Sequence, residues 1–253
     1  MTAPLPEKIQ TAVVTGGARG VGASIVRALH KAGYRVIIAD LNPGEEAKAL
    51  ASELDLAGET AITATLDISK PENFQEVLDK CIDRYGSVEV LVNNAARTMA
   101  QPVMDIDPAV FNEIMATNAG GTFAGCQIFA RHFKERGYGR IVNMASLAGQ
   151  NGGTATGAHY AASKGAILTL TKVFARDLAA YGITCNAISP GPMDSPMVRD
   201  IVGDKIEGFL KNIPVGQLGD PDFVANMVVM LASPEAAFVT GACWDVNGGL
   251  YVR

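Results

Sequence analysis

Short runs of apolar and β-branched residues alternate along the chain with longer stretches whose apolar positions recur at helical spacing. The short runs are nearly continuous, as expected for parallel strands that helices cover on both faces. They predict seven strands, at Thr11–Thr15, Arg35–Asp40, Ala61–Leu66, Glu89–Asn93, Arg140–Met144, Thr184–Ser189 and Cys243–Val246. The longer stretches predict helices at Val21–Ala32, Glu45–Leu56, Glu72–Tyr85, Pro108–Gly137 and Ala161–Tyr181.

Strands that alternate with helices in this way indicate βαβ units. We therefore expect an α/β protein with one doubly wound Rossmann domain over residues 1–253, in which helices cover both faces of a seven-stranded parallel sheet. The segment Pro190–Pro214 contains four prolines and little periodicity, so it is interpreted as a flexible flap.

The composition narrows the class of protein further. Hydrophobic residues make up 48% and charged residues 19%, which allows a large core and disfavours disorder. A net charge of −5 argues against nucleic acid as a partner. The start of the sequence lacks an apolar targeting segment, and no run approaches the roughly 18 apolar residues of a membrane span. Cys81, Cys126, Cys185 and Cys243 lie far apart, as is typical of reduced thiols, so we expect a cytoplasmic protein that does not bind a membrane.

A glycine-rich sequence, TGGARGVG at 15–22, joins the first predicted strand to the first predicted helix. Gly16, Gly20 and Gly22 permit a tight turn, a close approach of the backbone to a pyrophosphate, and close packing of the helix on the sheet. The start of the helix presents unpaired N–H groups and a positive dipole end to phosphates. A tight turn without a ligand would use the same glycines, so the loop alone leaves both interpretations open.

Asp40 ends the second predicted strand, about twenty residues after the glycines, as in dinucleotide-binding sequences. Its carboxylate can accept hydrogen bonds from both adenosine ribose hydroxyls and would repel a 2′-phosphate, which favours NAD over NADP. The alternative is a solvated aspartate at the head of the turn 40–44. Arg19 could neutralise a 2′-phosphate, so NADP remains possible.

Tyr160 and Lys164 lie four residues apart at the start of a long helical pattern, and thus on one face of the helix. A phenol has an ordinary pKa of about 10, and a neighbouring ammonium group lowers it, which makes a tyrosine a workable acid/base near neutrality. An ordinary exposed pair on a helix has the same spacing.

Three further polar residues support a catalytic interpretation. Ser146 follows a predicted strand, at the sheet edge where open α/β sheets bind ligands, and its hydroxyl could stabilise an alkoxide. Asn94 follows another predicted strand at the same edge. Asn118 falls in a largely apolar helical stretch, where a buried amide needs partners.

Taken together and in this order, these stretches resemble the short-chain dehydrogenase/reductase family over essentially the full length. The matching residues are TGGARGVG at 15–22, Asp67-Ile68, NNAA at 93–96, Asn118, Ser146, YAASK at 160–164 and Pro190-Gly191. Ala96 replaces a glycine of the family pattern, Ser195 stands where a threonine is usual, and the interval from Ser146 to Tyr160 is one residue longer than expected.

The resemblance implies a role for each matching residue. Tyr160 would be the acid/base, Lys164 would bind the nicotinamide ribose and lower the phenol pKa, Ser146 would orient the substrate carbonyl, and Asn118 would fix a water molecule. It implies hydride transfer without a metal. The cofactor-binding residues would be Gly16, Arg19, Gly20, Val21, Gly22, Asp40, Leu41, Asp67, Ile68, Asn94, Ala95, Tyr160, Lys164, Pro190, Gly191, Met193 and Ser195.

Other residues could select the substrate. His159 is interpreted as an inert pocket-wall or surface side chain, with a second acid/base as the alternative. Arg97 could bind a substrate carboxylate or phosphate, or could be a solvated loop residue. The remaining candidates for the pocket wall or its lid are Gln150, Asn151, Met193, Met197 and Val198.

These observations predict an NAD(P)-dependent oxidoreductase that acts on a small carbonyl or alcohol substrate. A reductase of 3-oxoacyl thioesters, carried by acyl carrier protein or CoA, is the alternative within this class. A non-catalytic NAD-sensing protein is the alternative outside it, although Tyr160, Lys164 and Ser146 are all present. The tail Trp244–Arg253 resembles a segment that packs across subunit interfaces in the family, which implies a homotetramer.

Overall fold

A seven-stranded parallel sheet forms the centre of the computed structural model, which describes residues 9–153, 156–195 and 206–252. The strand order is β3-β2-β1-β4-β5-β6-β7, and every neighbouring pair is parallel. The strands are β1 (Thr11–Thr15), β2 (Arg35–Asp40), β3 (Ala61–Thr65), β4 (Val90–Asn93), β5 (Gly139–Met144), β6 (Ile183–Pro190) and β7 (Cys243–Val246). The predicted doubly wound α/β fold is confirmed.

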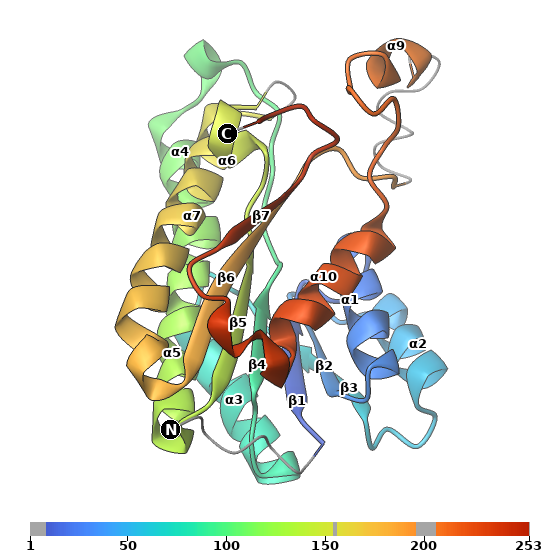
Figure 1. The fold of residues 1–253 in the computed structure, drawn as a ribbon, viewed down its shortest axis with the longest axis vertical. Coiled ribbons are helices and arrows are strands. Elements are labelled where there is room, and N and C mark those ends of the chain that lie inside the picture. Colours follow the sequence, from blue (N-terminus) through green and yellow to red (C-terminus); the bar gives the residue numbers. More distant parts are fainter. Residues whose placement is uncertain (1–8, 154–155, 196–205, 253) are drawn as a thin grey trace.

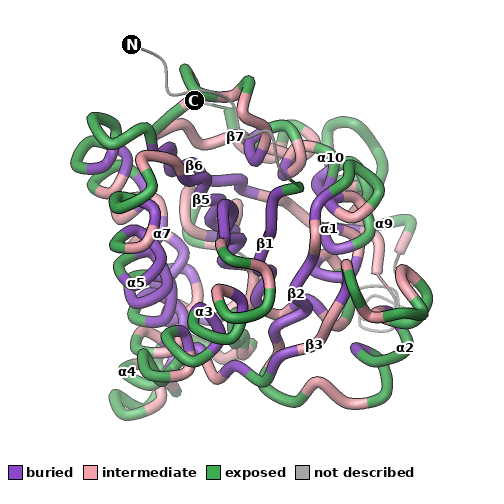
Figure 2. The backbone as a smooth tube through the Cα atoms, turned by 90° about the horizontal axis from the view of Figure 1, so that it is seen from below, coloured by how far each residue is buried: buried purple, intermediate pink, exposed green. Residues whose placement is uncertain are grey.

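Helices cover both faces of this sheet (Figures 1 and 2). One layer consists of α1 (Gly20–Lys31), α2 (Glu45–Leu54) and α10 (Pro221–Ala232). The other consists of α3 (Pro71–Tyr85), α5 (Gly121–Arg136) and α7 (Ala158–Leu178), with α4 (Pro108–Met115) leading into α5. The shorter elements are η1 (Val103–Asp105), η2 (Ala116–Gly120), α6 (Ala148–Asn151), η3 (Ala179–Tyr181), α9 (Ile206–Leu210) and η5 (Pro234–Phe238).

Successive strand residues enter two separate cores, one on each face of the sheet. In β1, Val14 packs into the core beneath α1 and α10, whereas Val13 packs into the core beneath α3 and α5. Ile38 and Ile37 divide in the same way in β2. Neighbouring side chains of a strand point to opposite faces of the sheet, and helices exclude water from both faces. The strand sequences are therefore continuous apolar runs. Figure 2 shows the buried strands between the two helical layers.

Helix α10 is an element that the sequence analysis did not place. Its signals are present, since Asp220 accepts a hydrogen bond from the backbone N–H of Asp222 at 2.8 Å and Pro221 occupies the first turn. Val224 and Val228 are fully buried. The helix completes the layer that contains α1 and covers this face of the sheet. The alternation of strands and helices predicts the fold even without it.

The predicted helix Pro108–Gly137 is interrupted rather than regular. A π-helical turn, η2, separates α4 from α5, and Gly137 ends α5 with a φ of 66°. The other predicted bounds match the observed ones or differ from them by at most three residues, and helix α7 begins at Ala158 rather than at Ala161. Within the described residues, no helix has the length and apolarity of a membrane span.

Candidate active site

The carboxyl ends of four central strands bring the predicted site residues to one edge of the sheet. Thr15 ends β1, Asn94 follows β4, Ser146 follows β5 and Pro190 ends β6. These strands are neighbours in the order β1-β4-β5-β6. Residues far apart in sequence therefore meet where parallel sheets bind ligands.

In the glycine-rich loop, Gly16 and Gly22 lie against backbone atoms, whereas Gly20 has free space around it. A Cβ on Gly22 would lie 2.0 Å from the carbonyl oxygen of Gly16, and a Cβ on Gly16 would lie 2.9 Å from Cα of Ala95. Gly20 has a φ of 55°, and nothing lies within 4 Å of a Cβ added to it. Two glycines therefore allow backbone contacts within the fold, while the third leaves the outer side of the loop clear.

The start of α1 carries no competing side chain. Arg19 occupies the N-cap position, makes no side-chain cap hydrogen bond, and is followed by no acidic residue in the first turn. The N–H groups of this turn thus keep their capacity to bind an anion, and the helix dipole favours one. The loop and the helix start fit the pyrophosphate of a nicotinamide dinucleotide.

Thr15 is a loop residue whose importance the sequence analysis missed. Its Oγ1 accepts hydrogen bonds from the backbone N–H groups of Asn94 and Ala95, both at 3.0 Å. In return, Nδ2 of Asn94 donates to the carbonyl oxygens of Thr15 and Gly16, both at 3.0 Å. Asn94, predicted as a nicotinamide-side contact, therefore fixes the glycine-rich loop against the end of β4. A hydroxyl at the end of the first strand is the signal that could have indicated this link.

Asp40 lies beside the glycine-rich loop, as its position at the end of β2 predicts. Its Oδ2 accepts a hydrogen bond from the backbone N–H of Ala18 at 3.2 Å. This contact makes the carboxylate part of the loop rather than a freely solvated turn residue. Arg19 and Leu41 on either side are exposed.

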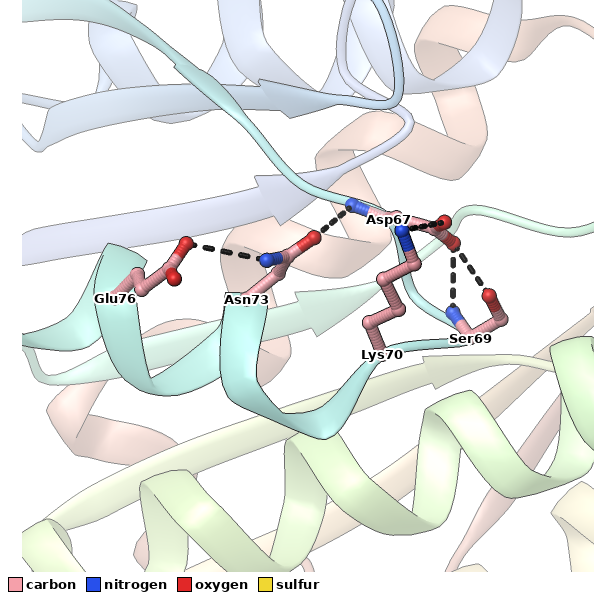
Figure 3. Close-up of polar contacts among 5 residues, drawn as sticks. All are labelled: Asp67, Ser69, Lys70, Asn73 and Glu76. Atoms are coloured by element: carbon pink, nitrogen blue, oxygen red, sulfur yellow. Dashed lines mark hydrogen bonds and ion pairs between the residues drawn. The ribbon is translucent and has the colours of Figure 1, made fainter.

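Asp67 belongs to a turn at the start of α3 (Figure 3). Its Oδ1 accepts hydrogen bonds from the backbone N–H of Ser69 at 3.0 Å and from the hydroxyl of Ser69 at 2.7 Å. These hydrogen bonds lower the pKa of the carboxyl group, and Lys70 lies 3.8 Å away. Asp67 is thus charged and oriented, and Ile68 beside it is buried.

Tyr160, Lys164 and Ser146 come together as the sequence predicts. Ser146 lies near enough to Tyr160 for its side chain to act on the phenol through hydrogen bonding and to lower its pKa. Nζ of Lys164 lies 5.7 Å from the centre of the Tyr160 ring and donates to the carbonyl oxygen of Met144 at 2.6 Å. Oγ of Ser146 also accepts from the backbone N–H of Ala148 at 3.1 Å, which fixes the hydroxyl at the start of α6.

The pKa of Tyr160 changes in the direction opposite to the predicted one. Burial raises the pKa of the phenol, and the hydrogen bond from Ser146 opposes this rise. Lys164 is also buried, and burial lowers its pKa to about 8. Burial therefore favours the neutral form of both groups, which weakens the electrostatic effect expected of the ammonium group.

Asn118 is fully buried in the π-helical turn. Its Oδ1 accepts from the backbone N–H of Arg97 at 2.8 Å, and its Nδ2 donates to the carbonyl oxygen of Arg97 at 2.9 Å and to Oγ of Ser163 at 3.0 Å. Ser163 in turn donates to the carbonyl oxygen of Tyr160 at 2.7 Å. The expectation that this amide has partners is confirmed, and these partners connect the loop after β4 to helix α7.

His159 and Arg97 are both held by neighbours. His159 is fully buried, and its Nδ1 accepts the backbone N–H of Tyr160 at 2.8 Å, so it is not a surface side chain. Arg97 is exposed, and it forms an ion pair with Glu113 on α4. Arg97 is thus paired with a carboxylate rather than solvated alone.

The segment that follows β6 packs against β7 and its following loop. Gly191 donates its backbone N–H to Val246 at 2.8 Å, and Pro190 accepts from the backbone N–H of Leu147 at 2.9 Å. Met193 is buried in the core of the α1 and α10 layer. Ser195 is the last described residue before the gap, and two predicted lid residues, Met197 and Val198, lie outside the described residues.

Two candidate pocket residues have local partners. Nε2 of Gln150 donates to Oδ1 of Asp245 on β7 at 2.7 Å. Oδ1 of Asn151 accepts the backbone N–H of Gly153 at 2.9 Å. These contacts fix α6 and the turn after it, next to the catalytic candidates.

The described arrangement can donate a proton to an oxygen atom. Two hydroxyl groups, on Tyr160 and Ser146, lie together at the sheet edge where the glycine-rich loop also lies. A buried cation, Lys164, holds the helix that carries the phenol against β5. The described residues include no group of three or more side chains suited to a metal ion.

Comparisons with known proteins cover nearly the whole chain. A family model described as enoyl-(acyl carrier protein) reductase matches residues 16–251. The chain is 35% identical over 244 residues to a 3-oxoacyl-(acyl-carrier-protein) reductase of Vibrio cholerae, covering 96% of this chain and 98% of that protein. It is 39% identical over 243 residues to an acetoacetyl-CoA reductase of Shinella zoogloeoides, covering 96% and 98%. It is 38% identical over 246 residues to a 4-formylbenzenesulfonate dehydrogenase of Comamonas testosteroni, covering 95% and 97%.

Proposed function

The chain belongs to the short-chain dehydrogenase/reductase family, and we propose that it interconverts a secondary alcohol and a ketone with Tyr160 as the acid/base. The observation that carries this proposal is the grouping of Tyr160, Lys164 and Ser146: Nζ of the buried Lys164 lies 5.7 Å from the centre of the Tyr160 ring, and the side chain of Ser146 opposes the rise in the pKa of the phenol. An NAD-sensing protein without activity would have no use for this trio of side chains.

A bound nicotinamide dinucleotide supplies or accepts the hydride in this chemistry. In the reductive direction, Tyr160 gives its hydroxyl proton to the carbonyl oxygen of the substrate, and it takes the proton back from the alcohol in the oxidative direction. Ser146 donates a hydrogen bond to the same oxygen and stabilises the negative charge that develops there. Lys164 holds the helix turn that carries the phenol, because its ammonium group is hydrogen-bonded to the end of β5.

The residues around the glycine-rich loop would hold the dinucleotide. Gly16, Gly20, Val21 and Gly22 would face the pyrophosphate of the dinucleotide, and Asp40 would bind the adenosine ribose. The remaining predicted contacts are Arg19, Leu41, Asp67, Ile68, Asn94, Ala95, Tyr160, Lys164, Pro190, Gly191, Met193 and Ser195. We propose NAD as the preferred form, because the carboxylate of Asp40 is oriented by the loop itself.

We propose a 3-oxoacyl thioester, or the corresponding 3-hydroxyacyl thioester, as the first substrate class to test. Relatives from Vibrio cholerae and Shinella zoogloeoides are named for such substrates. An aryl aldehyde or alcohol is the second class, because the Comamonas testosteroni relative is named for one. Acetoacetyl-CoA, assayed with NADH and NADPH, is the first probe. 4-Formylbenzenesulfonate, assayed with both the oxidised and the reduced dinucleotides, is the second, because the relative is named as a dehydrogenase of this aldehyde.

The substitution Tyr160→Phe tests the proposed acid/base. We expect kcat/KM to fall by about 10²–10⁴-fold with whichever probe the wild type converts, because the proton donor is lost while the ring remains. The measurement is the absorbance of the reduced nicotinamide. Tyr181→Phe, at an exposed tyrosine on η3, is the matched control and should retain activity. Undiminished activity of Tyr160→Phe would contradict the proposal.

We also propose a homotetramer, located in the cytoplasm. Phe123 on α5 and Phe174 on α7 form a ring pair with centroids 5.8 Å apart, and Phe123 and Val173 are exposed in the single chain. An exposed apolar face of this kind is typical of a subunit contact. A monomeric mass in solution would contradict the assembly, and cell fractionation would test the location.

A further inference from the structure

A buried amide, Asn143, joins five elements beneath the candidate site. Its Nδ2 donates to Oγ1 of Thr171 at 3.0 Å and to the Cys185 thiol sulfur at 3.5 Å. Its Oδ1 accepts from Nδ2 of Asn93 at 2.9 Å and from the Cys126 thiol at 3.6 Å. The side chain of Asn143 is fully buried, so these contacts take the place of water. They link β5 to β4, β6, α5 and α7.

The hydrogen bond between Asn143 and Thr171 has a fixed direction. The hydroxyl of Thr171 donates its single proton to the carbonyl oxygen of Ile167 at 2.8 Å, one turn earlier in α7. The same oxygen must therefore accept from the amide of Asn143. Thr171 is buried, so no solvent competes for this bond.

This bond lies close to the candidate catalytic groups along both elements that it joins. On β5, Asn143 precedes Met144, whose carbonyl oxygen accepts the ammonium group of Lys164. On α7, Thr171 follows Lys164 by seven residues, or about two helical turns, so both lie on the same face. Two polar contacts thus fix α7 against β5, and Tyr160 lies one turn beyond them.

Ser163 also forms a hydrogen bond outside α7, with Asn118, whereas the apolar buried residues of the helix supply non-directional packing. Ile167 and Leu178 are buried apolar side chains on this helix. Apolar contacts tolerate small shifts of a helix along a sheet, whereas a hydrogen bond weakens steeply with a change in angle or distance. The directional contacts therefore decide the axial position of α7.

We propose that Thr171 and Asn143 are positioning residues, whose hydrogen bond sets α7 against β5 and thereby holds the hydroxyl of Tyr160 at Ser146. This inference rests on the proposed role of Tyr160 as the acid/base. Neither residue is proposed to touch substrate or cofactor. Their effect passes through the placement of the helix, where a displacement of about 1 Å can cost a hundredfold in rate.

The substitution Thr171→Val tests the inference, because valine keeps the shape and removes both hydrogen bonds of the hydroxyl. We expect kcat with the active probe to fall by about ten- to a hundredfold, while the dissociation constant for the dinucleotide, measured by fluorescence titration, changes less than about twofold. The hydrogen bond from Ser146 lowers the pKa of Tyr160. A looser bond should therefore move the tyrosine ionisation in the pH profile of kcat to higher pH.

Two controls separate positioning from simple loss of stability. Thr171→Ser keeps the hydroxyl and should retain a near wild-type kcat and pH profile. Thr184→Val removes another buried threonine hydroxyl, on β6. This hydroxyl has no hydrogen-bond partner in the structure, so its removal should leave kcat and the pH profile unchanged. If the valine variant does not fold, Thr171→Cys replaces it, because a thiol is only a weak donor and acceptor.

The outcomes distinguish this inference from the proposed function. A Thr171→Val or Thr171→Cys enzyme with the wild-type kcat and pH profile, even at a lower melting temperature, would overturn the positioning role alone. In that case an inactive Tyr160→Phe would still support the proposed function. Full activity of Tyr160→Phe would overturn both.

Discussion

Asp40 shows how one residue can combine a structural contact with cofactor choice. One of its carboxylate oxygens accepts the backbone N–H of Ala18 in the glycine-rich loop. The other can still accept from a ribose hydroxyl. The residue therefore presents an oriented carboxylate at the place where we propose that NAD and NADP are distinguished.

The substitution Asp40→Ala should reduce the preference for NAD. We expect the ratio of kcat/KM for NAD to that for NADP to fall by about one to two orders of magnitude, the effect of removing a like charge roughly 4–6 Å from a 2′-phosphate. Steady-state assays with both cofactors measure this ratio. Arg19→Ala is the opposite control and should lower only the use of NADP. A wild-type enzyme that prefers NADP would overturn the prediction.

At the scale of elements, a glycine contact sets the distance between α6 and α7. A Cβ on Gly149 would lie 2.6 Å from the carbonyl carbon of Lys164 and 2.7 Å from the backbone nitrogen of Gly165. Both neighbours are backbone atoms and cannot move aside by a rotamer change. This contact keeps Ser146, at the start of α6, close to Tyr160 on α7.

The substitution Gly149→Ala should therefore separate the two hydroxyls. We expect kcat to fall about tenfold or more, with little change in cofactor affinity, because the misplacement affects the proton transfer. Gly208→Ala in α9 is the control, since nothing lies within 4 Å of its added Cβ. Stopped-flow single-turnover rates would separate the chemical step from product release. Equal rates for the two variants would contradict the argument.

The alternating elements were predicted from local patterns, whereas helix α10 and the π-helical turn were not. The strands were recognised because each is a continuous apolar run between turn residues. The Asp220-Pro221 start of α10 is a local signal from which this helix can be predicted. The π-helical turn around Asn118 has no local signature, because the amide's partners, Arg97 and Ser163, lie elsewhere in the sequence.

At the scale of the whole molecule, the buried ammonium group of Lys164 links stability to pH. Its pKa is about 8 in the folded protein, compared with 10.5 for an ordinary lysine. Between these values the unfolded chain binds more protons than the folded one, so the free energy of unfolding rises with pH across this interval. The stabilisation is complete above pH 10.5 and is lost as the pH falls through about 8.

The variant Lys164→Met should lack this dependence. Relative to the variant, we expect the wild type to gain up to about 3 kcal/mol of unfolding free energy between pH 8 and 10.5. Urea unfolding of both proteins at several pH values, at one protein concentration and without cofactor, measures the difference. If the free energies of unfolding of the two proteins changed with pH in parallel, the prediction that burial lowers the pKa of Lys164 would be wrong.

The sequence by itself determined the class of fold and the edge of the sheet that holds the candidate site, and its resemblance to the family indicated Tyr160 as the acid/base that we propose. The fold class and the edge follow from periodicity and chain direction, which are local properties. Tyr160 and Lys164 share a face of α7 because a helix repeats every 3.6 residues, whatever surrounds it. Ser146 and Asn94 reach one edge because parallel strands all end there.

Only the tertiary structure decided how the site is held and what burial does to its charges. The lowered pKa of Lys164, the raised pKa of Tyr160 and the link from Asn143 to Thr171 depend on packing between distant segments. Desolvation and hydrogen-bond geometry are set by which atoms exclude water from each group. The spacing of residues along the chain gives no information about desolvation or about hydrogen-bond geometry.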